Sequence, residues 1–172
     1  MSIGRRVTSV LEILGKYRDF LSGLNEEEFQ RSPAEGVWSY SEVYSHVLYV
    51  NKSSLIAIER CAFGNKNSTG RISWRAWLVF FLGKIPARTK APDKVAVMVQ
   101  KISLEDARND LIKLQEKLPE LISIVRDAPG KHKIKHPRLG MLNAKQWLRF
   151  IEIHSQHHLK QLKRIGSMLD RI

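Results

Sequence analysis

The sequence has almost no cysteine, no long hydrophobic run and no recognisable export signal, and each absence excludes a class of protein. Its 172 residues contain one cysteine, Cys61, so an internal disulfide is excluded. The longest apolar cluster, Ala76 to Leu82, is far shorter than the roughly 20 residues that a transmembrane helix needs. The basic start of the chain is not followed by the apolar stretch of a signal peptide. We therefore expect a protein of the reducing cytoplasm with no membrane partner.

Acidic residues are scarce too, with 17 Asp and Glu against 29 Lys and Arg, which gives a formal net charge of +12. A basic surface can attract nucleic acid, anionic lipid or an anionic small molecule, and it is also a common way to stay soluble. The excess is spread along the chain, with local concentrations at Lys84 to Lys94, Lys131 to Arg138 and Lys160 to Arg164. We find no recognition helix and no strand with interleaved aromatic residues of the kinds that bind nucleic acid. Nucleic-acid binding is therefore the hypothesis that we rank last.

No internal repeat, low-complexity tract or Pro/Gly/Ser-rich linker divides the chain, so we predict one domain over residues 1–172. Four segments show helical periodicity of their apolar residues, and no alternating strand pattern is convincing. The segments run from about Ile3 to Leu24, Ser39 to Cys61, Ser103 to Val125, and Asn143 to near the C-terminus. This pattern predicts an all-α four-helix bundle with a long crossover between the second and third helices.

Local sequence also predicts where these helices begin and break. The segments Ser39–Glu42 and Ser103–Asp106 both have the capping-box pattern, the second with Asp in place of the usual Glu. Asn143 is a good N-cap for the fourth helix. Pro119 falls inside the third helical segment and should kink or interrupt it.

The connection from Arg71 to Lys101 is rich in aromatic residues. They predict a short helix, after which Pro86 and Pro92 predict an extended crossing. So many aromatic side chains are not expected to lie in water as a plain loop. We expect them to pack on the end of the bundle and in part to form a homodimer contact. The aromatic residues are Trp74, Trp77, Phe80 and Phe81.

Three histidines fall on predicted inward faces. His154 and His158 are spaced i, i+4, so their side chains lie one above the other on the helix face that also carries Ile151. His46 falls on the apolar stripe of the second helix. Any one of them alone would be read as an ordinary core histidine, but three uncompensated buried rings would cost about 1–3 kcal/mol each. A shared metal ion offers a partner for all three, so we predict a metal site of His46, His154 and His158.

The remaining candidates are assigned no ligand role. His157 is read as a residue of the surface or one that contacts a ligand from outside the site, and His132 and His136 are read as loop residues. Glu152 should face away from His154, and we name no general base. Cys61 lies about 22 Å along its helix from His46 at 1.5 Å per residue, too far for a ligand.

Three stretches of the sequence resemble the DinB/YfiT-like family. Residues Gly36–Val47 resemble the G-x-W-S entry into a second helix with an inward histidine. Residues His136–Trp147 resemble the H-P-x-x-G-x-L-x-x-x-Q-W lead-in to the fourth helix, and His154–Gln161 match an H-x-x-H-H-x-x-Q ending. The order of the helices agrees along nearly the whole chain.

This resemblance implies a four-helix bundle with a three-histidine metal site, onto which His46, His154 and His158 map. The metals that it implies are zinc and nickel. Some members of the family look like thiol S-transferases that use low-molecular-weight thiols such as bacillithiol or mycothiol, and others have no known activity. The Trp-rich connection after the second helix is the least typical part of this sequence.

Three imidazoles leave at least one coordination position of a metal open, which is the pattern of a catalytic site. Water or a thiol at that position would be deprotonated more easily, so hydrolysis and thiol transfer are both reasonable. Three hypotheses stay open: a metal-dependent transferase or hydrolase acting on a small molecule such as a low-molecular-weight thiol, a non-catalytic metal-binding stress-response module, and a basic nucleic-acid-binding protein.

Overall fold

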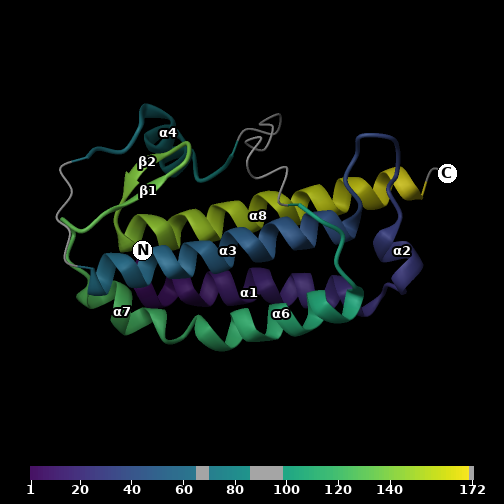
Figure 1. Cartoon of the computed structure of the whole chain (residues 1–172), viewed down its shortest axis with the longest axis horizontal. Coiled ribbons are helices and arrows are strands. Elements are labelled where there is room, and N and C mark those ends of the chain that lie inside the picture. The colour runs from purple at the N-terminus through teal and green to yellow at the C-terminus, as the bar shows by residue number, and fades with distance from the viewer. Residues whose placement is uncertain (65–69, 86–98, 171–172) are drawn as a thin grey trace.

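The computed structural model describes residues 1–64, 70–85 and 99–170. Four long helical segments lie side by side along the longest axis of the molecule (Figure 1). The predicted all-α four-helix bundle is therefore confirmed. Its segments are α1 (Ile3–Ser22), α3 (Tyr40–Phe63), α6 (Leu104–Lys117) continued by α7 (Leu121–Asp127), and α8 (Ala144–Leu169).

The order of the helices requires a long connection. In Figure 1, α3 and α6 run in the same direction, whereas α1 and α8 run in the opposite one. The chain must therefore return along the whole bundle between α3 and α6, and the short helix α4 (Trp74–Leu82) lies within this crossover. The expected extended crossing with Pro86 and Pro92 falls at residues 86–98, outside the described residues.

The predicted helix starts are found, with one difference. Ser39 and Glu42 form a complete capping box at the start of α3, and Asn143 caps α8 through the backbone N–H of Gln146. Ser103 also caps α6, but the Asp106 carboxylate accepts a hydrogen bond from the Ser103 hydroxyl at 2.7 Å. Because Asp is one methylene shorter than Glu, only half of the usual capping box forms there.

Pro119 divides the third segment as predicted. Helix α6 ends at Lys117 and α7 begins at Leu121, with Leu118 buried between them. A proline ring clashes with the preceding turn and supplies no backbone N–H, so it kinks or breaks a helix, and here the helix breaks. The predicted interruption therefore gives two shorter helices, α6 and α7, in place of one continuous helix.

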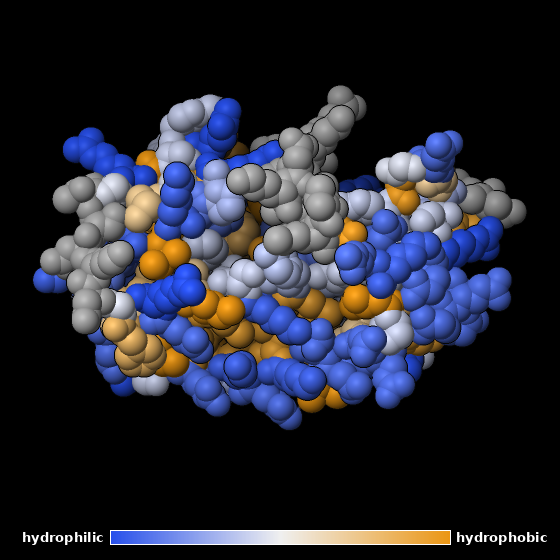
Figure 2. Space-filling view, viewed as in Figure 1, coloured by the Kyte–Doolittle hydropathy of each residue, from blue (hydrophilic) through white to orange (hydrophobic). Residues whose placement is uncertain are grey.

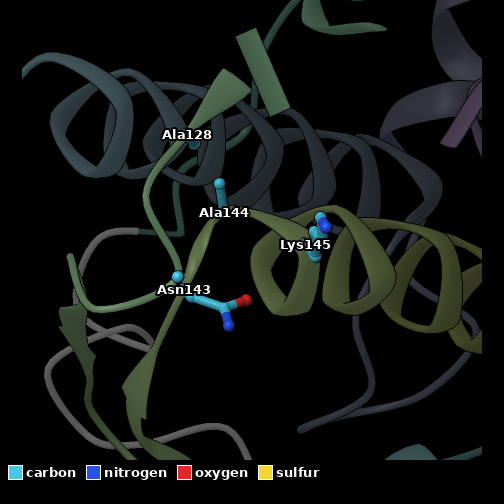
Figure 3. A pocket seen from close by; sticks show the side chains of 5 residues that line it. Ala128, Asn143, Ala144 and Lys145 are labelled. Carbon is cyan, nitrogen blue, oxygen red and sulfur yellow. The ribbon is translucent and has the colours of Figure 1, made fainter. Parts of the chain in front are cut away.

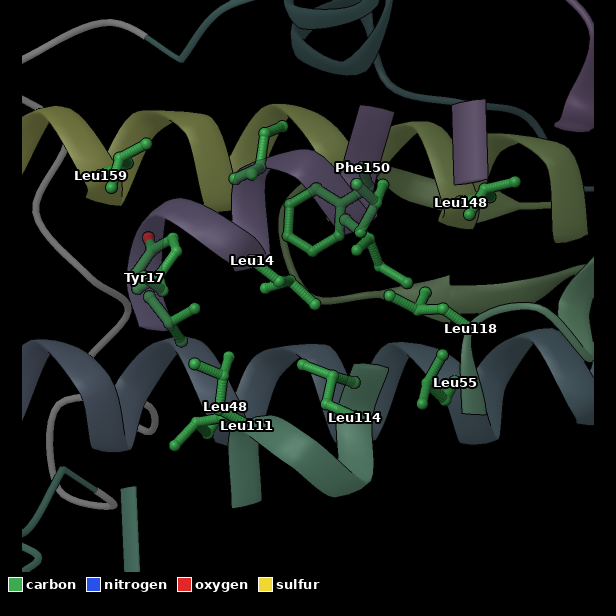
Figure 4. Packing of buried hydrophobic residues seen from close by; sticks show 14 of the residues in the cluster. Leu14, Tyr17, Leu48, Leu55, Leu111, Leu114, Leu118, Leu148, Phe150 and Leu159 are labelled. Carbon is green, nitrogen blue, oxygen red and sulfur yellow. The ribbon is translucent and has the colours of Figure 1, made fainter. Parts of the chain in front are cut away.

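The core is a single apolar cluster to which all four helical segments contribute (Figure 4). Two fully buried tyrosines reach across it. The Tyr17 hydroxyl donates to the Ser155 carbonyl at 2.8 Å, and the Tyr44 hydroxyl donates to the Tyr17 carbonyl at 2.7 Å. The Asn51 amide donates to the Ser155 hydroxyl at 3.1 Å. Buried polar groups are therefore paired where α1, α3 and α8 meet, which fixes the helices relative to one another.

A two-stranded antiparallel hairpin is present, although the sequence showed no convincing alternating strand pattern. Its strands are β1 (Ile134–His136) and β2 (Gly140–Leu142). Strands of three residues are too short to show an alternating pattern. Ile72 extends the hairpin by an isolated bridge to Gly140, whose φ is +80°. A Cβ at Gly140 would lie 2.8 Å from the Arg71 carbonyl oxygen, so a side chain has no room there. The helix α2 (Glu26–Gln30) is the second short element that was not predicted.

The aromatic segment forms the predicted short helix, α4, but only part of it packs on the bundle. Ala76 and Val79 are buried, and Phe80 is half-buried against the core. Three aromatic side chains remain largely in solvent. Their exposed fractions are 69% for Trp74, 58% for Trp77 and 72% for Phe81. The expected dimer contact stays a prediction.

Most of the face seen in Figure 2 is hydrophilic, with hydrophobic residues visible between the helices. Within the described residues, no helix is both long and apolar enough to cross a membrane. The cytoplasmic location expected from the sequence stays a prediction.

Candidate metal centre

The three histidines predicted as ligands meet between α3 and α8. His46 comes from α3, and His154 and His158 come from successive turns of α8. The Nε2 atoms of His46 and His154 are 3.1 Å apart, and each of the three residues offers a ring nitrogen within 4.8 Å of the others. The ring centroids are 4.5–5.1 Å apart. The predicted convergence of the three rings is therefore confirmed.

This geometry fits one small cation. Nitrogen ligands at 2.0–2.1 Å from a tetrahedral zinc ion are about 3.3 Å from one another. The 3.1 Å between His46 and His154 is close to that value. The side chains are almost enclosed, since His46 and His154 are 5% exposed and His158 is 8% exposed. A cation at this point would be held largely out of water.

Burial keeps the three rings neutral near pH 7. Desolvation is the main cause, and it lowers the pKa of His46 to about 4 and that of His158 to about 3. The pKa of His154 is lowered well below its usual value by desolvation and by the neighbouring rings. A neutral imidazole keeps a lone pair on one nitrogen, which is the form that binds a metal.

Gln161 orients one of the rings. The Nδ1 atom of His158 is 2.7 Å from the Gln161 side-chain oxygen, which can only accept a hydrogen bond. Nδ1 therefore carries the proton and Nε2 carries the lone pair. In the described part of the chain, the buried Nδ1 atoms of His46 and His154 have no such partner. Gln161 was not predicted as a partner of His158, although its i, i+3 spacing from that histidine was a usable signal.

Aromatic side chains flank the histidines on both sides. The Trp38 ring lies 5.3 Å from His46, and the Phe150 ring lies 5.1 Å from His154. His136 packs 4.5 Å from Phe150, so its assignment to a loop is wrong. It ends β1, and its Nδ1 accepts hydrogen bonds from the backbone N–H groups of the two residues that follow Pro137, each at 3.1 Å. Burial lowers its pKa to about 4.

The charged groups that act on these rings are cations. His157 is half-buried, and its ring lies 5.0 Å from that of His158. Burial and the positive charges of Arg164 and Lys160 lower the pKa of His157. Arg164 also acts on His158. With three neutral rings and cations nearby, the centre favours an anionic group.

Glu152 and Cys61 lie outside the centre, as predicted. The Glu152 carboxylate faces α1, where it is 3.2 Å from Arg6 Nε and accepts from the Ser9 hydroxyl at 2.9 Å. It also pairs with Arg149 at 2.6 Å. It is buried, however, so it does not face solvent. The Cys61 thiol is buried 3.6 Å from a backbone carbonyl oxygen. No carboxylate in the described residues forms a hydrogen bond with the three central histidines.

A small pocket near the start of α8 is separate from this centre (Figure 3). Its volume is about 120 Å³. Ala144 in its wall precedes His154 by about 15 Å along the helix. The pocket is smaller than the roughly 300 Å³ of typical ligand sites. It is lined by Ala128, Gly130, Asn143, Ala144 and Lys145.

A family model and one solved structure, that of YfiT, agree with this fold. A model of the DinB superfamily matches residues 12–162. YuaE of Bacillus subtilis (strain 168), an uncharacterized protein, is 24% identical over 151 residues, which are 88% of this chain and 91% of YuaE. YfiT from Bacillus subtilis, with an unusual four-helix bundle topology, has a TM-score of 0.65 and 13% identity, covering 98% of this chain and 87% of YfiT. TT2238, also a four-helix bundle, has a TM-score of 0.47 and 21% identity, covering 94% and 96%.

Proposed function

Because this chain belongs to the DinB superfamily, we propose that it is a metal-dependent enzyme that acts on a small molecule. His46, His154 and His158 are the ligands of one divalent ion, zinc or nickel. The observation that carries this proposal is the meeting of the three ring nitrogens within 4.8 Å of one another. Three ligands leave a coordination position open, as in catalytic rather than structural zinc sites.

An ordinary packing role explains the three rings less well. Buried polar groups normally have hydrogen-bond partners. Here the Nε2 atoms of His46 and His154 face each other at 3.1 Å, and one shared proton could join only these two of the three rings. A bound cation would accept the lone pairs that point into the centre. It would also offset the desolvation of three rings at one place.

The chemistry follows from the donor set and its surroundings. A divalent ion with an open position lowers the pKa of water or of a thiol enough for either to act as a nucleophile near pH 7. The described residues place no carboxylate base at the rings, so the site favours reactions whose nucleophile needs no separate base. Gln161 holds the His158 tautomer, and Trp38 and Phe150 keep bulk water from the flanks.

Hydrolysis is our first candidate, since YfiT is described as a probable metal-dependent hydrolase. Thiol transfer is the second, because the cations Lys160 and Arg164 favour an anionic substrate such as the thiolate of a low-molecular-weight thiol. A metal-binding module without turnover is the remaining alternative.

The test begins with protein purified without chelator or nickel affinity resin. Metal content is measured, and the protein is reconstituted with zinc and with nickel. We expect one ion per chain, and none in His46→Ala. His132→Ala is the matched control, because its ring lies 3.2 Å from the Cys61 carbonyl oxygen, outside the centre. Loaded protein is then assayed for hydrolysis of chromogenic esters and amides and for thiol addition to an electrophile. A wild-type protein that binds neither ion would refute the proposal, and an ion without turnover in any assay would favour the non-catalytic module.

A further inference from the structure

The outer face of α4 is an unusual surface for a water-soluble helix. Trp74, Trp77 and Phe81 are spaced i, i+3, i+7, so they lie on one side of the helix. The rings of Trp77 and Phe81 are stacked, with centroids 5.1 Å apart and an interplanar angle of 7°. The guanidinium of Arg75 lies 5.2 Å from the centre of the Trp74 ring. We call these three aromatic residues the α4 face.

The area of the α4 face limits what it can bind. Aromatic side chains have about 150–250 Å² each to bury, and these three are 69%, 58% and 72% exposed. Together they therefore present about 400 Å², the size of the functional patches on monomeric proteins. A stable protein–protein interface buries about 800 Å² on each partner. The α4 face alone is thus too small to hold a second copy of this chain.

The surroundings of the α4 face are strongly basic. Residues 70–85 and 128–151 contain nine basic residues and no acidic one. The two segments lie together, because the Ser73 N–H donates to the Leu139 carbonyl at 2.9 Å and Ile72 bridges to Gly140. Figure 1 shows α4 and the hairpin side by side outside the bundle. Among the residues that the structure describes, only Arg149 of these nine forms an ion pair.

We propose that α4 and the β1–β2 hairpin form a peripheral docking surface for a membrane that contains anionic lipids. The aromatic residues of the α4 face enter the boundary between headgroups and acyl chains. The cations, among them Arg75, Lys135 and Arg138, face the lipid phosphates. Membrane-surface helices bury Trp, Phe and Leu side chains at the headgroup boundary, and Lys and Arg nearby attract them to anionic lipids. The expectation of no membrane partner rested on the lack of a spanning segment, which does not bear on a helix that lies on the surface.

Charge distinguishes this partner from a second copy. A symmetric dimer through the α4 face would bring two clusters of unpaired cations together, whereas an anionic lipid surface neutralises them. Nucleic acid would also neutralise them. The neighbouring Leu82 is 45% exposed, and an aliphatic side chain gains little from bases but much from acyl chains.

The experiment is co-sedimentation of the full chain with two kinds of vesicle. One kind is pure phosphatidylcholine, and the other contains about a third phosphatidylglycerol to represent an anionic leaflet. We expect at least tenfold stronger binding to the anionic vesicles, with a blue shift of tryptophan fluorescence. Trp77→Ser combined with Phe81→Ser should lose this binding at least tenfold. Ile112→Ser on α6 is the matched control, because Ile112 is 47% exposed on another helix. Circular dichroism checks that both variants are folded.

Four outcomes would overturn the proposal. The first is a wild type that does not bind anionic vesicles, or binds neutral ones equally well. The second is equal binding by the wild type and the double variant. The third is a wild type that sediments as a dimer without vesicles while the double variant sediments as a monomer. That result would make the α4 face a contact with a second copy. Tighter binding to single-stranded DNA than to vesicles would likewise assign the surface to nucleic acid.

Discussion

Replacing Gln161 with Leu should weaken metal binding without touching a metal ligand. The Gln161 side-chain oxygen accepts from His158 Nδ1 at 2.7 Å, which keeps the lone pair on Nε2, toward His46 and His154. Leu has a similar bulk but cannot accept a hydrogen bond. The His158 ring would then be free to turn or to place its proton on Nε2, where it would block ligation.

The expected loss of metal affinity can be estimated from what hydrogen-bond partners contribute to metal-binding histidines. Removing a hydrogen-bond partner from a metal-binding histidine typically lowers metal affinity about 10–100-fold, or about 1.4–2.7 kcal/mol of binding free energy. The upper half of this range is expected, because Gln161 supports the one ring of the three that has a partner among the described residues. Gln161→Glu should restore or exceed wild-type affinity, since a carboxylate is a stronger acceptor.

The assay is competition for zinc against a chromophoric chelator at pH 7.5. Gln156→Leu is the matched control, because Gln156 has the same side chain, lies on the same helix and is half-buried too. If Gln161→Leu binds zinc within threefold of the wild type, or loses no more affinity than Gln156→Leu, then Gln161 does not orient the ligand. A wild type that binds no metal would instead refute the proposed function.

Two further predictions concern the fold. His154→Ala should abolish metal binding and leave a helical, cooperatively unfolding protein, since the apolar core is built by all four helical segments; loss of the circular dichroism spectrum would show that the ion holds the fold. The metal-free protein should lose stability as the pH falls from about 6.5, the usual histidine pKa, toward 4. In that window the unfolded chain binds protons that the folded chain does not, because burial lowers the pKa of His46 to about 4. A ring like His46 changes the free energy of unfolding by at most about 3 kcal/mol over this window. A urea midpoint that is equal at pH 7 and pH 4.5 would contradict the predicted loss of stability.

The bundle could be predicted from the sequence because its signals are local. Apolar stripes and N-caps such as Ser39 and Asn143 depend on residues within a few positions of each other. The hairpin was missed because its three-residue strands are stabilised by a partner distant in sequence, Ile72. The exposure of the α4 face was not foreseen either, since periodicity shows that a helix has an apolar side but not whether another element covers it.

The candidate metal centre also has residues that the sequence predicts and residues that it does not. His46, His154 and His158 could be found because helical spacing places them on inward stripes, and α3 packs directly against α8. His136 was misassigned because its burial comes from Phe150 and Trp147, which reach it only after the hairpin folds over α8. Ring contacts between separate elements leave no periodic signal in a sequence.

The separation of the ligands along the chain sets when the centre can exist during synthesis. His46 and His154 are 108 residues apart. A ribosome making about 5–20 residues per second would expose His46 several seconds before His154. In that interval α3 has no α8 to pack against, and a single imidazole holds a divalent ion weakly. If the proposed centre binds a metal, loading therefore has to follow the docking of α8, and an occupied centre would mark a chain whose bundle has already closed.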